Sequence, residues 1–259
     1  HYLHDRHRAT GKRLLFACFG LFLLSLLSKS MAVTLPVVML LLDRYMGRKI
    51  DYRVLSEKLP FFVLSVVFGV VAIYSQKAFG AIEAIPEFSR LDHIFLVSYA
   101  VIFYVIKLLA PFHLSAMHGY PMKINGFLPI YCYAAPLVIV ITAWAVLRAK
   151  QFRGVLALGF LFFLITVGPV LQILPVGGAL VSERYTYVPG IGIFFLIGYF
   201  FCHWYEGGNR GDAKPRVFAW VLVGSLTVLF SVIAFNRTKV WADSFTLWSD
   251  VIAKNPRIA

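Results

Sequence analysis

A short polar stretch between two long apolar runs carries the residues best suited to chemistry. It runs from Ser182 to Tyr187 and includes a carboxylate at Glu183, a guanidinium at Arg184 and two phenols, at Tyr185 and Tyr187. Arginine and tyrosine bind a phosphate through several oriented donors, and a glutamate can orient a base, a sugar hydroxyl or the arginine itself. Tyrosine and arginine are also common where a span meets the lipid headgroups, but such an anchor does not require Glu183.

Three polar side chains elsewhere could contribute to the same chemistry. Gln172 lies near the end of the preceding apolar run, and together with Glu183 it indicates a polar cavity that opens outward. Lys29 interrupts a nearly continuous apolar stretch. It either snorkels and marks a turn, or it holds a phosphate at the outer membrane surface. Lys107, near the end of another run, is either an anchor or a second phosphate contact.

The residues that commonly bind metals do not form a recognisable metal site. Cys18, Cys132 and Cys202 lie inside apolar runs without CxxC spacing, so we expect them to act as small hydrophobic residues. His1, His4 and His7 could share one helix face, but a solvated basic loop explains them better. We therefore expect no metal and no cofactor. The motifs of P-loop nucleotide hydrolases, zinc proteases and serine hydrolases are missing from the sequence as well.

The composition places these residues in a membrane protein. The chain is 60% hydrophobic and only 14% charged, which is more apolar surface than one soluble core can bury. Eight apolar runs approach the length of a membrane span, at about 14–28, 31–42, 59–76, 94–110, 128–147, 154–174, 188–204 and 217–235. We therefore predict an all-α, polytopic helical bundle of about seven to eight membrane segments.

The basic residues predict how the bundle is oriented. The net charge is +13, but the basic residues are dispersed over short loops, which favours anionic lipid as the partner over nucleic acid. Basic loops at 1–13, 43–58, 148–153 and 206–216 favour the cytoplasm. The 111–127 loop, the Ser182–Tyr187 stretch and the tail from Asn236 are then expected outside.

These assignments conflict, because three full spans between the basic loops at 43–58 and 148–153 would carry the chain to the wrong side of the membrane. One segment must therefore not cross. The candidate is 94–118, which we expect to lie in the interface or to re-enter; the alternative is eight crossings with one basic loop outside. Domain organisation is predicted as one membrane domain, 1–235, followed by an outer-face tail, 236–259. Since the chain opens on a basic loop and stops abruptly, we expect a piece of a longer protein.

Several stretches, in their order, resemble a known family. They are LLSLLSKSMAVTLPVVMLLLDRY (23–45), SEKLPFF (56–62), YVIKLLAPFHLSAMHGYP (104–121), VGPVLQILPVGGALVSERYTYVPGIGIF (167–194) and WADSFTLWSDVIAKNP (241–256). Together they resemble bacterial membrane glycosyltransferases of GT-C type that carry tetratricopeptide repeats. They are also similar to the animal transmembrane and tetratricopeptide-repeat O-mannosyltransferases.

This resemblance implies a specific reaction. A sugar would pass from a polyprenyl-phosphate carrier, the donor substrate, to an acceptor such as a protein hydroxyl on the outer or luminal face. It also implies the bacterial cytoplasmic membrane, or alternatively the endoplasmic reticulum. Lys29 would contact the carrier phosphate, and Glu183, Arg184, Tyr185 and Tyr187 would line the same cavity. The catalytic base would lie upstream of His1, so the catalytic residues are unknown and the chain alone is expected to be inactive.

Two other classes of function fit the same residues. One is a transporter or flippase for a lipid-linked or anionic substrate, in which Lys29, Glu183 and Arg184 would line a pathway. No internal repeat is visible in the sequence and the charges fall at span ends, which favours surface chemistry. The other is a structural anchor that presents a repeat domain to partners.

Overall fold

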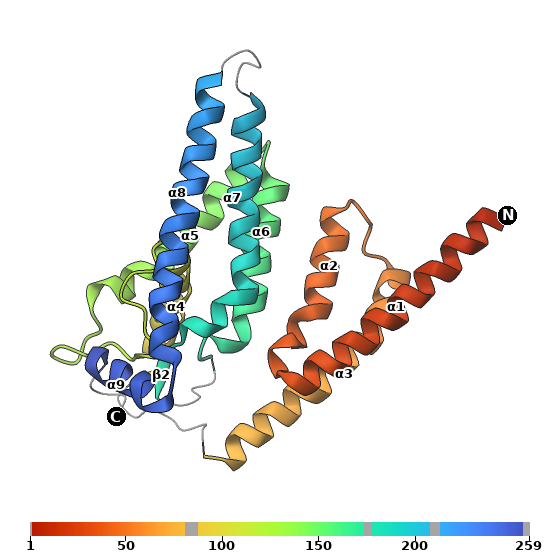
Figure 1. Cartoon of the computed structure of the whole chain (residues 1–259). Coiled ribbons are helices and arrows are strands. Elements are labelled where there is room, and N and C mark those ends of the chain that lie inside the picture. The colour runs from red at the N-terminus through yellow and green to blue at the C-terminus, as the bar shows by residue number, and fades with distance from the viewer. Residues whose placement is uncertain (1, 81–87, 174–177, 208–212, 256–259) are drawn as a thin grey trace. The chain divides into compact units, whose positions relative to one another are not determined.

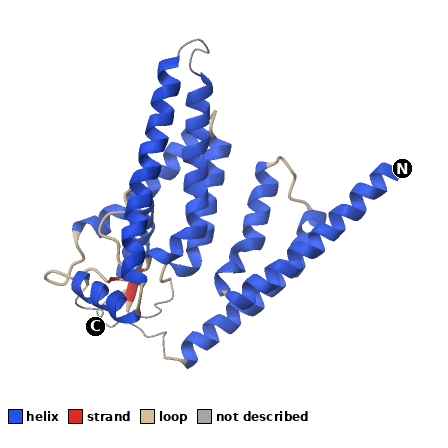
Figure 2. Ribbon diagram, in the orientation of Figure 1, coloured by secondary structure: helices blue, strands red, loops and turns tan. Residues whose placement is uncertain are grey.

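The computed structural model describes residues 2–80, 88–173, 178–207 and 213–255, and they form two compact units, 1–84 and 85–259. The described part is all-α, with nine α-helices and one small two-stranded sheet (Figures 1 and 2). The first unit contains α1 (Tyr2–Ser28), η1 (Ser30–Thr34), α2 (Leu35–Tyr45) and α3 (Tyr52–Ala78). The second contains α4 (Arg90–Leu109), β1 (His118–Gly119), α5 (Ile130–Arg148), α6 (Arg153–Val167), η2 (Gly168–Val170), β2 (Ala179–Val181), η3 (Glu183–Thr186), α7 (Tyr187–Gly207), α8 (Ala213–Thr238), η4 (Lys239–Trp241) and α9 (Ser244–Lys254).

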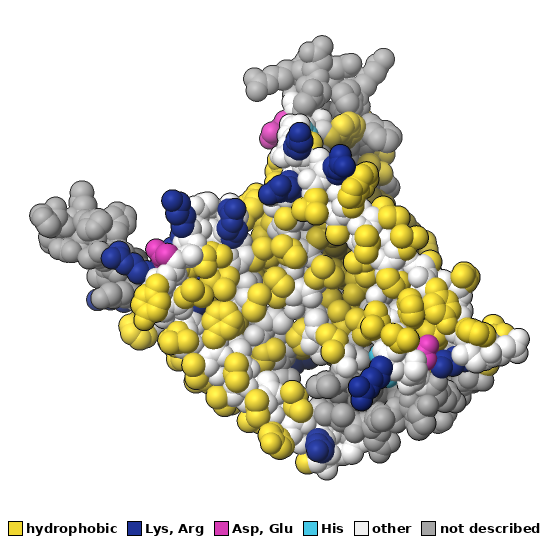
Figure 3. All heavy atoms as spheres, turned by 180° about the vertical axis from the view of Figure 1, so that it is seen from behind, with side chains coloured by type: hydrophobic (Ala, Val, Ile, Leu, Met, Phe, Trp, Pro, Cys, Tyr) yellow, Lys and Arg dark blue, Asp and Glu magenta, His cyan; other side chains and the backbone are white. Residues whose placement is uncertain are grey.

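Six helical segments of the described chain are long and apolar enough to cross a membrane. They are Tyr52–Ala78, Arg90–Leu109, Ile130–Arg148, Arg153–Val170, Glu183–Glu206 and Ala219–Trp241. By the length and hydropathy of these helices, the chain is a multi-span helical membrane protein. Over the second unit, the face in Figure 3 is mostly hydrophobic, and Lys and Arg side chains gather toward its two ends, as expected for a bundle surrounded by lipid.

The prediction of seven to eight membrane segments is confirmed only for these six. The run at 14–28 lies in α1, whose apolar part, Arg13–Ser28, is shorter than a full span. The run at 31–42 divides into η1 and an α2 of 11 residues. An α-helix of that length reaches roughly 16 Å, about half of the hydrocarbon thickness. One of the two roles considered for Lys29 was to mark a turn. The helix does break there, because α1 ends at Ser28 and Lys29 precedes η1.

The first unit has a small aromatic core of its own. Phe22, Leu26 and Phe61 are almost fully buried where α1 packs on α3. The Phe19 ring meets the Phe61 ring edge-on, with centroids 5.3 Å apart. Asp51 caps the start of α3, accepting a hydrogen bond of 2.9 Å from the Val54 N–H.

The closest helix pair of the second unit, α6 and α7, depends on two glycines. A Cβ placed on Gly192 would lie 2.4 Å from the carbonyl oxygen of Gly159, and a Cβ on Gly159 would lie 2.3 Å from Cγ of Leu196. Small residues let helix backbones approach in this way inside membranes, where packing replaces the hydrophobic effect as the driving force. The main core of the unit joins this pair, through Phe163 and Ile193, to buried residues of α4, α5 and β2.

Helix α4 has the length and hydropathy of a span, but the loop that follows it returns along its side. The His118 ring lies 4.8 Å, between centroids, from the Phe103 ring, and Lys123 pairs with Asp92 in the first turn of α4 at 2.7 Å. Irregular backbone at membrane depth is tolerated where protein buries it. These contacts are compatible with the interfacial or re-entrant segment expected at 94–118, which stays a prediction.

Candidate functional site

One end of the second unit gathers three segments that are distant in sequence. Ser182 donates a hydrogen bond of 2.7 Å from Oγ to the carbonyl of Ala116, which connects the end of β2 to the loop after α4. Lys254, at the end of α9, donates from Nζ to the carbonyl of Leu114 at 2.8 Å. These contacts bring Leu114 and Ala116 of the 111–127 loop to Ser182 and to Lys254 of the tail, whereas Lys123, later in the same loop, lies at the first turn of α4. That the loop, the Ser182–Tyr187 stretch and the tail share the outer side of the membrane stays a prediction.

Glu183 fastens this assembly with its carboxylate. Oε1 of Glu183 accepts a hydrogen bond of 3.1 Å from the backbone N–H of Ser115 and lies 2.7 Å from Nε2 of His118. The Glu183 side chain is only 16% exposed and Ser115 is buried, so both interactions are largely shielded from water. The Glu183 carboxylate therefore holds a histidine and a backbone turn, a role that the sequence did not indicate. Its predicted part in orienting a base, a sugar hydroxyl or Arg184 stays a prediction.

Local backbone geometry prepares the two loops for this junction. His113 and Gln172 both adopt positive φ, +50° and +55°, which turns the chain sharply after α4 and after η2. Lys107 stabilises the first turn, because Nζ donates to the carbonyls of Phe112 and His113, the latter at 3.2 Å. Gln172 stabilises the second, because Nε2 donates to the carbonyl of Ala179 at 3.0 Å.

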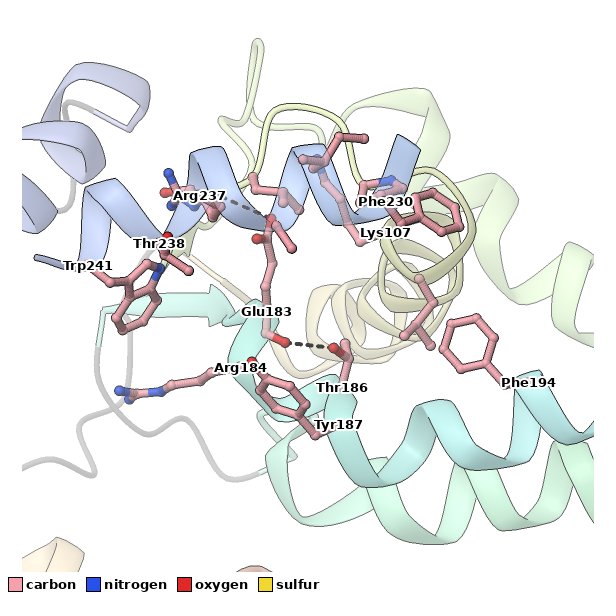
Figure 4. A pocket seen from close by; sticks show the side chains of 16 residues that line it. Lys107, Glu183, Arg184, Thr186, Tyr187, Phe194, Phe230, Arg237, Thr238 and Trp241 are labelled. Carbon is pink, nitrogen blue, oxygen red and sulfur yellow. Dashed lines mark hydrogen bonds between the residues drawn. The ribbon is translucent and has the colours of Figure 1, made fainter. Parts of the chain in front are cut away.

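A cavity of about 980 Å³ opens beside this junction (Figure 4). It is lined by residues from the end of α4 and its loop, from η3 and α7, and from α8 and η4. They are Lys107, Leu108, Pro111, Leu114, Ser115, Glu183, Arg184, Thr186, Tyr187, Phe194, Phe230, Ile233, Ala234, Arg237, Thr238 and Trp241. The cavity therefore combines an apolar wall between two candidate spans with polar and charged groups where those spans end.

Three cations and one carboxylate line the cavity, and they differ in how they are engaged. Lys107 is held by the two carbonyls described above, and Glu183 by Ser115 and His118. Arg184 is exposed, lies 3.4 Å from the hydroxyl of Tyr185 and rests over that ring. Within the described residues, Arg184 has no carboxylate within 4.0 Å, so its charge is available to an anion from outside.

Arg237 is the most distinctive of the three cations. Nη1 donates to Oδ2 of Asp250 at 2.8 Å, but Nη2 is buried and has no hydrogen-bond partner in the described part of the chain. Burial raises the pKa of Asp250, but hydrogen bonds from Lys254 and Arg237 outweigh it and hold that pKa below its ordinary value. A buried guanidinium N–H without a partner costs free energy, and a phosphate oxygen is a strong acceptor for it.

Some of the predicted site residues share this cavity and others do not. Glu183, Arg184 and Tyr187 line it, and Tyr187 is 83% exposed. Tyr185 is not a lining residue but contacts Arg184, and Gln172 shapes the chain before β2 instead. Lys29 belongs to the first unit, so its convergence with Glu183 on one phosphate site stays a prediction.

Sequence reasoning missed three contributors to this end of the bundle. Arg237 and Trp241 fell in a segment predicted to be a polar tail, and His118 fell in the segment with the unresolved crossing. A signal for Arg237 was present, because a lone arginine directly after an apolar run needs an anionic partner or a headgroup. Within the described residues, no three His, Cys, Asp or Glu side chains are close enough to hold a metal ion. The side chains of His1, His4 and His7 lie outside the part that the structure describes, so the prediction about them is not tested.

Comparisons of the chain with protein-family models, with curated proteins and with solved structures find no match. The family resemblance seen in the sequence therefore rests on its motifs alone. What the helices show is a multi-span membrane protein, and the cavity is the feature from which a function must be argued.

Proposed function

We propose that the chain is a membrane glycosyltransferase of GT-C type that takes a sugar from a polyprenyl-phosphate carrier. The observation that carries this proposal is the cavity in which Arg184 and Arg237 lie beside an apolar wall at the ends of α7 and α8. The acceptor, such as a protein hydroxyl, would be used on the non-cytoplasmic face of a bacterial cytoplasmic membrane, or in the endoplasmic reticulum. The link to tetratricopeptide repeats rests on the sequence resemblance.

The cavity suits a lipid phosphate because its chemistry changes from one wall to the other. Phe194 on α7 and Phe230 and Ile233 on α8 offer an apolar surface to an isoprenoid tail. Arg237 lies about one to two turns beyond Phe230 and Ile233 on α8, and Arg184 lies in η3, directly before α7, where a headgroup would follow the tail. A soluble anion would use only the cationic side chains, whereas a lipid phosphate would use both these and the apolar wall. The combination therefore favours an amphiphilic ligand.

The same groups support the transfer step. When the glycosidic bond to the carrier breaks, negative charge develops on the leaving phosphate, and preorganised guanidinium groups stabilise that charge most in the transition state. Glu183 and His118 would act as positioning residues, because the Glu183 carboxylate is held in the junction and His118 does not line the cavity. The base that takes the acceptor's proton is not assigned.

A transporter or flippase is the second candidate, and the same cavity supports it. A flippase also has to bind an anionic headgroup between helices, and the apolar wall between α7 and α8 would accommodate the tail. The two candidates differ in outcome: a transferase breaks the bond between phosphate and sugar, whereas a flippase returns the lipid intact.

The experiment uses the purified chain in nanodiscs and a labelled polyprenyl phosphate. Arg184→Gln and Arg237→Gln should each weaken binding by about tenfold or more, since hydrogen bonds to a charged group contribute about 1.5–3 kcal/mol. Lys150→Gln is the matched control, because it removes the same charge from an exposed position in the α5–α6 loop, outside the cavity. Equal affinity in all three variants would refute the phosphate site.

A transfer assay then separates the two functions. Because the catalytic base is expected upstream of His1, this assay uses the full-length protein, as wild type and as Arg237→Gln, with a labelled polyprenyl-phosphate sugar and a hydroxyl-containing peptide. Labelled peptide that is lost in Arg237→Gln supports the transferase. Intact lipid that moves between leaflets of proteoliposomes, without labelled peptide, supports the flippase.

A further inference from the structure

Helix α9 presents an apolar stripe that the described residues leave exposed. Phe245, Trp248 and Ile252 are 82%, 47% and 45% exposed. Their spacings of three and four residues place them on one side of the helix. Val251, which is fully buried, lies roughly 90° around the helix from the centre of this stripe, so one flank of α9 packs while the stripe stays exposed. An exposed stripe of three large side chains indicates a surface with a partner.

The position of α9 in the chain indicates what that partner is. The last candidate span ends at Trp241, and α9 begins at Ser244, so the helix starts within a few residues of the membrane boundary. Asp243 caps it, accepting hydrogen bonds from the N–H and the hydroxyl of Thr246 at 2.7 and 2.8 Å, and α9 turns away from the axis of α8 (Figure 1). A helix that leaves a span at this point remains at the level of the headgroups.

The composition of the stripe fits a lipid surface. Tryptophan is enriched at the boundary between headgroups and acyl chains, where its ring is buried and its N–H stays hydrated. Two residues of η4 (Lys239–Trp241), between the last candidate span and α9, fit the same surface. Lys239 is exposed and rests over the Phe235 ring, where it can meet anionic headgroups. Trp241 is 46% exposed and adds a second tryptophan close to the start of α9.

We propose that α9 is an interfacial helix whose stripe of Phe245, Trp248 and Ile252 inserts into the boundary of the same bilayer that the spans cross. This inference does not depend on the reaction proposed above. Its consequence for the site is mechanical, because α9 also holds the loop after α4. Asn255 donates from Nδ2 to the carbonyl of Met117 at 3.0 Å, and Lys254 to that of Leu114. The membrane would thereby hold the cavity mouth at a fixed depth.

The test uses the full chain in nanodiscs of phosphatidylethanolamine and phosphatidylglycerol, with a nitroxide label on α9. The three native cysteines are replaced by alanine, and Phe245→Cys carries the label. Ala253→Cys is the matched control, because it is also exposed but lies about 80° around the helix from Phe245, away from the stripe. Accessibility is measured to oxygen, which partitions into lipid, and to a water-soluble nickel chelate.

The expected result is a label at 245 that oxygen reaches and nickel does not, with a label at 253 that nickel reaches more readily. Nickel access at both positions would place the stripe in water and overturn the proposal. A label at 245 that neither reagent reaches would also overturn it, because a second copy or another protein would then cover the stripe.

Discussion

Replacement of Glu183 tests whether its carboxylate stabilises the fold or takes part in catalysis. Glu183→Ala removes the acceptor for the Ser115 N–H, which is buried, and the partner of His118 Nε2. An unsatisfied buried donor costs about 1–3 kcal/mol, and the lost hydrogen bond of the charged group about 1.5–3 kcal/mol. We expect a total near 3–5 kcal/mol. Glu183→Gln keeps an acceptor oxygen in place and should cost about 1 kcal/mol.

Thermal unfolding in detergent measures the difference. For a unit of this size, 1 kcal/mol shifts Tm by about 2–4 °C, so Glu183→Ala should lower Tm by about 6–20 °C and Glu183→Gln by about 2–4 °C. His118→Ala combined with Glu183→Ala should cost less than the sum of the two, because both remove one interaction. The reasoning fails if Glu183→Ala leaves Tm within about 2 °C of wild type. Loss of transfer in Glu183→Gln at unchanged Tm would instead make the carboxylate catalytic.

Two further predictions concern the packing of the bundle. Gly192→Ala places a Cβ 2.4 Å from the Gly159 carbonyl, so the helices must separate, and we expect a loss of about 1–3 kcal/mol or more in thermal unfolding; Gly224→Ala, with open space around it, should cost little. Asp250 has a lowered pKa, so its ion pair with Arg237 stabilises the fold above the ordinary pKa of aspartate and is lost as pH falls through the lowered value. Asp250→Asn should therefore flatten the acid limb of a plot of Tm against pH, and an unchanged limb would contradict this assignment.

The sequence was informative about the bundle because lipid leaves few alternatives. A run such as 128–147 must be helical to satisfy its backbone, and α5 occupies it almost residue for residue. The run at 31–42 was not a full span, because hydrophobicity does not show where a turn forms, and Ser30–Thr34 form η1. The α-helix that remains, α2, is too short to cross a membrane although it is apolar.

The candidate site was less accessible from sequence, for a different reason. Glu183 and Arg184 stood out because each is a charge in an apolar setting, and both line the cavity. The partner of Glu183 is His118, which lies 65 positions earlier, and no local pattern connects the two. Arg237 is similar, because its role follows from an unpaired nitrogen and not from its neighbours in the chain.

The contact between Lys254 and the Leu114 carbonyl joins residues 140 positions apart. A ribosome must therefore finish every candidate span before this fastening can form, and domains emerge from synthesis with the N-terminal part first. Until then, the loop after α4 lacks its hydrogen bond from Lys254. A nascent chain interrupted after Trp241 would contain all six candidate spans but not Lys254, so the order of synthesis delays this contact until after the last of those spans has been made.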